Sequence, residues 1–194
     1  MSLEAKSLPL YFSSYSYPIE EPEYEYPEDA EDWPEFDECP YKNAEHLAIC
    51  LNRSLGRCEM PEADTHPPRF AMSSWGNFNF QDMGCVESVW YDAKTGAPHM
   101  IALMWSELAQ PQNEELCRAE VDAAIMIMHG RLRDPSLRSH VNAPVLLLSA
   151  IGEHHLRVIE AYFDKDQLVM RSSPLMNMRE WDLGWLITLA RWCW

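Results

Sequence analysis

Between Tyr41 and Leu55, apolar residues recur at spacings of three and four positions. The recurring residues are Ala44, Leu47, Ala48, Leu51 and Leu55. This spacing places them on one face of an α-helix, and the glycine that follows at position 56 is a common residue at a helix end. The pattern predicts a helix over residues 41–55.

The middle of the chain changes to short runs typical of β-strands. Residues 78–80, 86–91 and 99–105 are β-prone, and turn-forming residues at 92–96 separate the last two runs, which predicts a hairpin. Residues 145–148 are Val-Leu-Leu-Leu, an uninterrupted apolar run typical of a strand that is covered on both faces. Residues 156–163 and 168–171, joined at 164–166, predict a second hairpin.

A second helix is predicted between the two hairpins. Asn113 is a plausible N-cap, followed by acidic residues that suit the positive end of a helix dipole. The apolar stripe that follows consists of Cys117, Val121, Ala124, Ile125, Met128 and Leu132. We expect this stripe to face the sheet.

The C-terminal segment, residues 178–194, predicts a third helix that is rich in tryptophan. Its main stripe consists of Met178, Trp181, Trp185, Leu189 and Trp192. Because further apolar residues lie off this stripe, the helix must be covered, either by the sheet of its own domain or by a partner or second copy. On the second alternative Trp181, Trp185 and Trp192 would bind the partner.

These elements together predict one α/β domain over residues 41–194, with a mixed central β-sheet flanked by helices. The 194-residue length fits one domain plus a tail. The tail is residues 1–40, where prolines are frequent and twelve acidic side chains stand against Lys6 alone, a charge of −11 (1 − 12). Repelling charges and the lack of an apolar face predict a disordered arm.

Four aromatic residues interrupt the acidic arm: Tyr24, Tyr26, Trp33 and Phe36. Aromatic side chains among carboxylates resemble acidic recognition segments, while the simpler interpretation is a solubilising tail. The net charge of the whole chain is −16, which argues against binding to nucleic acid and favours a basic protein partner.

No signal-like N-terminus and no membrane-length apolar run is present in the sequence. The six cysteines are scattered through a chain that is large enough to fold without disulfides. We therefore expect free thiols and an intracellular location, cytoplasmic or nuclear.

The order helix, hairpin, helix, buried strand and hairpin strand over residues 41–171 resembles the core of the PD-(D/E)XK nuclease-like superfamily, which several fungal families share. The run Glu87-Ser88-Val89-Trp90-Tyr91-Asp92 is similar to its first acidic element, with Glu87 in the metal-binding position. The resemblance implies an acid-x-Lys triplet on the next strand. At that place the chain has Leu103-Met104-Trp105.

Without this triplet, Leu103 and Trp105 can neither bind a hard cation nor stabilise charge on a phosphate. An active nuclease would need relocated groups. The candidates are Glu87, Asp92, Glu107, Glu114 and Arg118, with Mg²⁺ or Mn²⁺ held at Glu87. The resemblance otherwise implies a catalytically inactive domain.

The sequence gives little support for a zinc ion or for a bound nucleotide. Cys50, Cys58 and His66 lack the paired spacing of a zinc site, and no glycine-rich phosphate loop is present. His154 and His155 are adjacent beside a predicted strand, so we expect their side chains to point to opposite faces.

We therefore predict a catalytically inactive nuclease-like domain that binds a protein partner and holds no cofactor, with the acidic arm capturing a basic surface. The alternatives are a metal-dependent nuclease with relocated residues, and a structural protein that self-associates through the C-terminal helix, for example as a homodimer.

Overall fold

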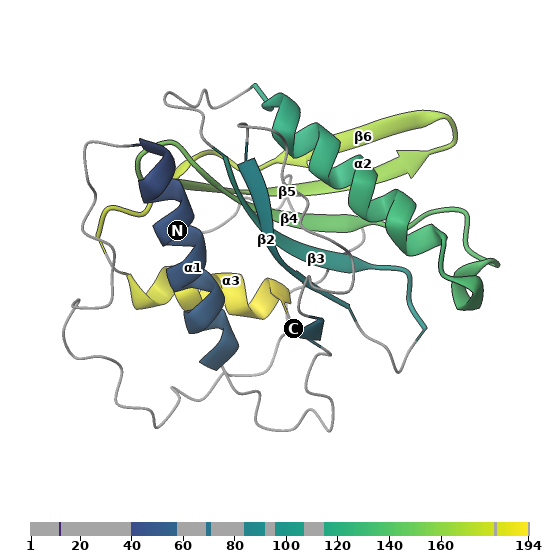
Figure 1. The fold of residues 1–194 in the computed structure, drawn as a ribbon, viewed down its shortest axis with the longest axis horizontal. Helices are drawn as coiled ribbons and strands as arrows, with labels where there is room; N and C mark the ends of the chain where they lie inside the picture. The colour runs from purple at the N-terminus through teal and green to yellow at the C-terminus, as the bar shows by residue number, and fades with distance from the viewer. Residues whose placement is uncertain are drawn as a thin grey trace.

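The computed structural model describes residues 12, 40–57, 69–70, 84–91, 96–106, 115–180 and 182–193. Within these ranges it contains three α-helices, which are α1 (Pro40–Arg57), α2 (Arg118–Leu132) and α3 (Leu183–Cys193), and a short 3-10 helix, η4 (Pro135–Leu137). The strands are β1 (Arg69–Phe70), β2 (Gly84–Trp90), β3 (Met100–Ser106), β4 (Val145–Ile151), β5 (His155–Asp164), β6 (Gln167–Ser172) and β7 (Met176–Asn177). Figure 1 shows their arrangement.

The strands form one sheet in the order β1-β2-β3-β4-β5-β6, with β7 also paired to β5. Neighbouring strands are antiparallel except for β3 and β4, which run parallel with Met100 opposite Val145 and Ser106 opposite Ile151. A parallel pair needs a crossover connection, and α2 lies in the chain between β3 and β4. The prediction of an α/β domain with a mixed sheet is confirmed.

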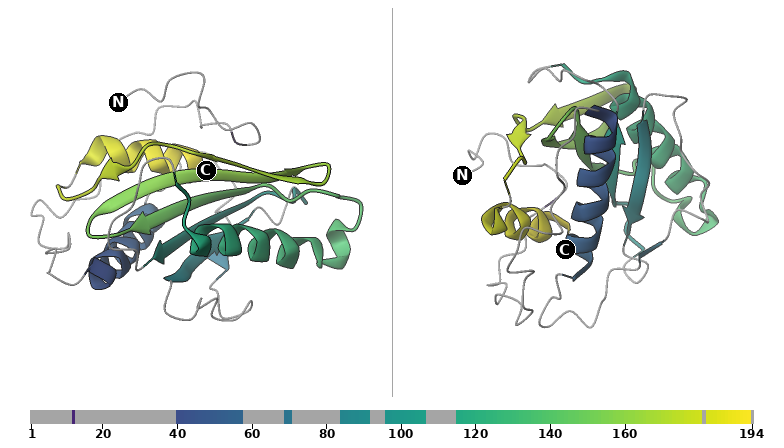
Figure 2. Two further views of the ribbon diagram at one scale, coloured as in Figure 1. Left: turned by 90° about the horizontal axis from the view of Figure 1, so that it is seen from above. Right: turned by 60° about the vertical axis from the view of Figure 1, so that its left-hand side comes forward.

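Helices cover both faces of the sheet (Figure 2). On one face, which we call the α1 face, α1 and α3 pack against residues of β3, β4 and β5 such as Leu103, Leu148 and Leu156. On the other, which we call the α2 face, α2 packs against residues such as Met104 and Leu147. Each strand of the sheet interior therefore sends alternate side chains into two separate apolar layers.

The strand predictions for the second half of the chain are confirmed. Every residue of β4 is buried, as its uninterrupted apolar run predicts. β5 and β6 form the predicted hairpin, with Asp164 opposite Gln167 and Lys165 at a positive φ of 56° in the turn. β2 and β3 are antiparallel as predicted, while residues 78–80 and 92–95 lie outside the described ranges.

The second helix begins later, and packs on a different face, than the sequence pattern predicts. Cys117, and not Asn113, is its N-cap. The buried residues are Ala119, Glu120, Ala123, Ala124, Ile127, Met128 and Arg131. The small alanines allow the helix to approach the sheet closely, and Glu120 and Arg131 are buried beside them. Ala124 and Met128 of the predicted stripe are buried as expected, but Val121 and Ile125 are not, so the stripe is displaced by about a quarter turn.

The C-terminal helix is shorter than predicted. Residues 176–177 form β7 beside β5, and the Met178 backbone N–H donates to the His154 carbonyl at 2.7 Å, so Met178 precedes the helix. In α3, Leu186, Leu189 and Ala190 are buried in the apolar layer shared with α1. The chain's own domain therefore covers much of the apolar surface of this helix.

The acidic arm, including Tyr24, Tyr26, Trp33 and Phe36, lies outside the described residues apart from Phe12 and Pro40, and Pro40 already belongs to α1. The ring of Phe12 meets the imidazole of His99 edge-on, with 5.6 Å between ring centroids and 87° between the planes. The predicted disorder of residues 1–40 stays a prediction, and at Phe12 the segment contacts the folded domain just before β3.

Candidate functional site

Glu87, which would bind the metal ion if the domain were an active nuclease, lies at an irregularity in β2. Val86 is opposite Met104 and Ser88 is opposite Leu103, so Glu87 is an extra residue with no partner of its own on β3. Such a β-bulge bends a strand and redirects a side chain, and bulges are common beside active sites. The local backbone is therefore suited to presenting a functional carboxylate.

The Glu87 carboxylate is half-buried beside a second carboxylate. Burial, and to a smaller extent the charge of Glu45 on α1, raise the pKa of Glu87 above its ordinary value. Burial and these two carboxylates also raise the pKa of the Cys85 thiol. The surroundings of Glu87 on the α1 face are therefore negative and partly desolvated, which disfavours the thiolate as a nucleophile.

The positions where the nuclease triplet would lie are occupied by apolar side chains. Leu103 is fully buried in the α1-face layer, and Trp105 packs partly buried against the same layer. Met104 between them faces α2. Around Glu87 the next strand therefore contributes packing and neither an oxygen ligand nor a lysine, and the described residues contain no group of three metal-ligating side chains.

Of the other residues that a nuclease with relocated groups would use, only Arg118 lies in the described part of the chain. Asp92, Glu107 and Glu114 lie outside the described ranges. The side chain of Arg118 is 80% exposed, and its Nε bonds Asp122 Oδ2 one turn along α2 at 3.3 Å. Because α2 packs on the opposite face from α1, Arg118 is not placed to serve as the relocated cation beside Glu87.

The predicted partner-binding tryptophans lie in different environments. Trp181 is outside the described residues, Trp185 is partly buried, and Trp192 is only 7% exposed. Trp192 is thus mostly enclosed by its own domain. The second candidate surface for a partner, on α3, is correspondingly small in the described part of the helix.

A buried ion pair on the α2 face is the main polar feature that the sequence did not reveal. Glu120 and Arg157 are both fully buried. Arg157 Nε donates to Glu120 Oε1 at 2.7 Å, and a second guanidinium nitrogen donates to Glu120 Oε2. The third nitrogen donates to the Glu115 carbonyl at 2.9 Å, so each guanidinium nitrogen donates a hydrogen bond within the domain.

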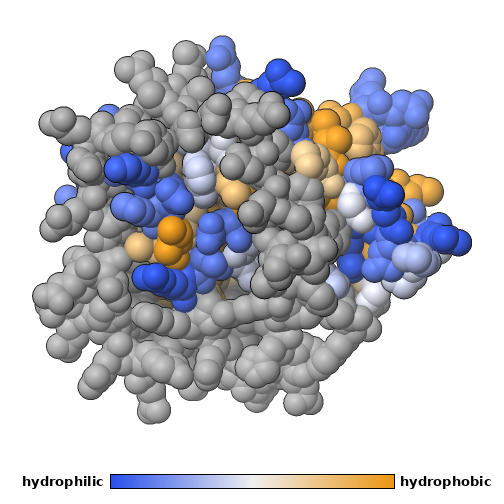
Figure 3. All heavy atoms as spheres, viewed as in Figure 1, coloured by the Kyte–Doolittle hydropathy of each residue, from blue (hydrophilic) through white to orange (hydrophobic). Residues whose placement is uncertain are grey.

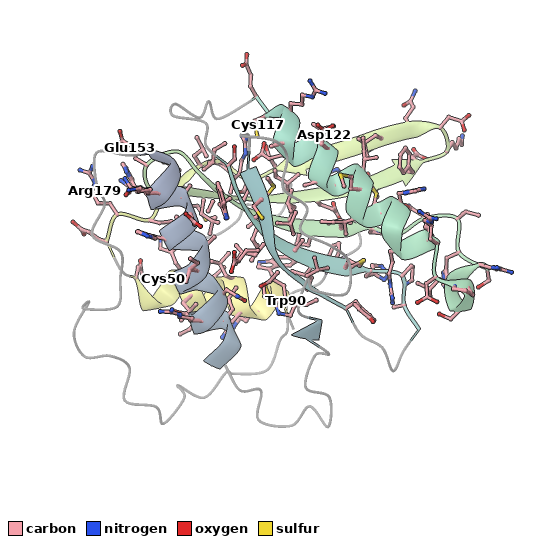
Figure 4. The ribbon with its side chains drawn as sticks, viewed as in Figure 1. Cys50, Trp90, Cys117, Asp122, Glu153 and Arg179 are labelled. Carbon is pink, nitrogen blue, oxygen red and sulfur yellow. The ribbon has the colours of Figure 1, made fainter. Side chains whose placement is uncertain are left out.

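The same carboxylate also caps α2. Glu120 Oε2 accepts the backbone N–H of Cys117 at 2.8 Å, and the Cys117 thiol lies 3.8 Å from the Ser106 hydroxyl at the end of β3. Figure 4 shows Cys117 at the start of this helix. The signals were present in the sequence as an acid three residues after the cap and an arginine inside an apolar strand. Because the Glu120 carboxylate and the Arg157 guanidinium bind each other and backbone groups of the same domain, this cluster is structural.

The two adjacent histidines differ from expectation. The rings of His154 and His155 are stacked, with 4.4 Å between centroids and 29° between planes, and do not point to opposite faces. The strand begins only at His155, so the alternation rule does not apply to His154. Burial and the neighbouring positive charge of Arg179 help to lower the pKa of both imidazoles.

Among the described cysteines, Cys85 and Cys117 are free thiols. Among the described helices none is both long enough and apolar enough to span a bilayer. Comparison of the chain with protein-family models, with curated proteins and with solved structures finds no match.

Proposed function

We propose that this chain is a catalytically inactive nuclease-like domain that acts as a protein-binding module. The order of elements supports the PD-(D/E)XK-like interpretation. A helix is followed by antiparallel strands, then a crossover helix, and then a fully buried strand parallel to β3. A single acidic residue at the bulge of β2 is the remaining trace of a metal site.

The absence of catalysis rests on one observation, the burial of Leu103 and Trp105 where a carboxylate and a lysine would act. A divalent ion needs several oxygen ligands at once, and phosphoryl chemistry needs a cation to stabilise the developing charge. Glu87 and Glu45 supply negative charge alone. The negative potential around these carboxylates also repels the phosphates of a nucleic acid, as does the net charge of −16.

The binding role rests on the composition of the acidic arm. Carboxylates attract a basic surface over a distance of about one Debye length, roughly 8 Å at physiological salt. The aromatic residues Tyr24, Tyr26, Trp33 and Phe36 add contact area that salt does not screen. Together they suit capture of a basic protein surface.

The catalytic half of the proposal is tested by incubating the purified chain with labelled single- and double-stranded DNA and RNA in Mg²⁺ or Mn²⁺. We expect no cleavage above that of the Glu87→Gln variant. Cleavage that depends on Glu87 and on the metal would establish the alternative, a nuclease with relocated residues.

The binding half is tested with the full chain and a variant in which the four arm aromatics are changed to serine. Both are used as bait for proteins of the source cell at low and high salt. We expect the wild-type chain to retain basic partners that the variant releases at high salt. Equal retention by the two chains would show that the arm only solubilises the domain.

A further inference from the structure

The two-residue strand β7 is held on the sheet by the backbone of the two adjacent histidines. In the pairing of β7 with the start of β5, Asn177 lies opposite His155. One residue further along, the backbone N–H of Met178 donates to the carbonyl of His154 at 2.7 Å. The position of residues 176–178 therefore depends on the conformation of this pair of histidines.

β7 also covers part of the apolar layer on the α1 face. Met176 and Met178 are only 6% and 3% exposed, and they belong to the same buried cluster as Leu156 of β5. In Figure 3 the described surface over α1 is mostly hydrophilic, because the apolar side chains of this helix point into the layer. Release of β7 would expose the two methionines and the apolar residues beneath them.

The geometry of the two imidazoles suits the neutral form of both rings. Their centroids are 4.4 Å apart, and the side chain of His154 is only 12% exposed. The Nδ1 atom of His155 is buried and forms no hydrogen bond with a described residue. A neutral imidazole can leave this nitrogen without a proton, whereas the protonated ring would bury an N–H donor that has no acceptor among the described residues.

The charged groups around the pair also favour the neutral rings. Burial, and then the charges of His155 and Arg179, lower the pKa of His154, while burial and Arg179 lower the pKa of His155. Glu153 acts in the opposite direction, but its side chain is 51% exposed and its Oε2 lies 3.9 Å from His154 Nδ1. Figure 4 shows Glu153 and Arg179 on the same side of the molecule. Two protonated rings at this separation, beside a guanidinium group, would repel one another.

We propose that His154 and His155 form an acid-sensitive switch, in which the neutral rings hold β7 on β5 and their protonation releases β7 and uncovers the apolar layer. A histidine whose pKa is lowered by folding leaves the native state fully stable above its ordinary pKa of 6.5, and destabilises that state as the pH falls below this value. The change is local because β7 has only two residues, and short peripheral elements open at a lower free energy than the strands of the core. This switch does not depend on the binding role proposed for the acidic arm.

The test is hydrogen–deuterium exchange of the full-length chain at about pH 7.5 and about pH 5.5, with the rates corrected for the intrinsic effect of pH on exchange. We expect the protection of the amides of residues 176–178 to fall severalfold at the lower pH. The amides of β4, residues 145–151, should keep their protection and so show that the rest of the sheet stays folded. Equal protection of residues 176–178 at the two pH values would overturn the proposal.

Two variants assign the effect to the histidine pair. The double variant His154→Phe with His155→Phe keeps two stacked rings that cannot be protonated, and its residues 176–178 should stay protected at both pH values. His129→Phe, at an exposed position on α2, is the matched control and should open in acid as the wild-type chain does. Acid opening of the double variant equal to that of wild type would contradict the proposal.

A measurement on the wild-type chain keeps the test independent of how the double variant folds. Nuclear magnetic resonance follows the ring protons of His154 and His155 as the pH is lowered. We expect both rings to titrate below the ordinary pKa of 6.5, together with the loss of protection at residues 176–178. Rings that titrate at or above 6.5 would show that the fold does not favour their neutral form, and would overturn the proposal.

Discussion

Two carboxylates on opposite faces of the sheet differ in almost every physical respect. Glu120 is fully buried and accepts hydrogen bonds from the Arg157 guanidinium and from the Cys117 backbone. Glu87 is half-buried at a bulge, and the charge that acts on it is that of another carboxylate, Glu45. The charge of Glu120 is compensated by groups of the same chain. The charge of Glu87 is partly buried and is repelled by that of Glu45.

The comparison shows which of the two has a structural role. A buried charge is tolerated only when its partners are fixed in place, as they are for Glu120. At Glu87 the ordinary remedy for two close carboxylates is a cation, and in an active nuclease a metal would supply it. On the interpretation proposed above, Leu103 and Trp105 stand in place of the remaining ligands, so the electrostatic cost of such a site would persist without its chemistry.

The largest expected effect is at the complete site. Arg157→Leu should lower the free energy of unfolding by about 3–5 kcal/mol, because it leaves the Glu120 charge buried and unpaired. Urea denaturation followed by circular dichroism measures it. The double variant Glu120→Leu with Arg157→Leu is the control and should recover at least about 2 kcal/mol of that loss. Equal losses in the two variants would show that packing, and not charge, dominates at this position.

Removing the apolar neighbour on the Glu87 side should also be costly. Leu103→Ala should lower the free energy of unfolding by about 2–5 kcal/mol, since Leu103 is fully buried and its truncation leaves a cavity. The same denaturation measurement applies. A loss below about 1 kcal/mol would mean that this position is not part of the packed core.

A smaller and opposite effect is expected at Glu87 itself. A carboxyl whose pKa is raised by folding stabilises the native state below its ordinary pKa of 4.5, and that contribution is lost as the pH rises through the raised value. Glu87→Gln should therefore be more stable than wild type at pH 7, by less than about 1 kcal/mol because the group is partly solvated. The difference should vanish below pH 4.5.

Unfolding measured from pH 4 to pH 8 tests this sign. Glu45→Gln is the matched variant and should produce a gain in the same direction, because it removes the smaller cause of the shift. A variant at Glu87 that is less stable than wild type at pH 7 would mean that Glu87 has a favourable partner.

The smallest effect is expected at the surface ion pair of α2. Arg118→Ala should change the free energy of unfolding by no more than about 0.5 kcal/mol, because the Arg118 side chain is 80% exposed and its pair with Asp122 is solvated. The change in the free energy of unfolding of this variant is the reference for the larger loss expected in Arg157→Leu. Losses of similar size at the two arginines would remove the distinction between buried and exposed pairs.

The sequence predicted the elements best where one local pattern decides the structure. The apolar run of β4 and the helical spacing of α1 needed no knowledge of the rest of the chain. The prediction of the packed face of α2 was wrong because two of its buried residues, Glu120 and Arg131, are polar. Their partners come from strands and turns that are distant in the sequence. The local hydrophobic pattern therefore predicted Val121 and Ile125 on the packed face instead.

The candidate site was predicted in part for the same reason. Glu87 was chosen from the resemblance of its strand to a known family, and Leu103 and Trp105 from the count along the next strand that this resemblance implies. Glu45 could not, because its approach to Glu87 depends on how α1 crosses the sheet. Likewise the stacking of His154 on His155 depends on where the turn ends and β5 begins.

The central claim is that Glu87 belongs to a site that can no longer hold a metal ion. Titration of the full-length chain with Mn²⁺ in a calorimeter, beside the Glu87→Gln variant, tests it directly. The account predicts no saturable heat that differs between the two chains. Saturable binding by the wild-type chain that is lost in Glu87→Gln would contradict it.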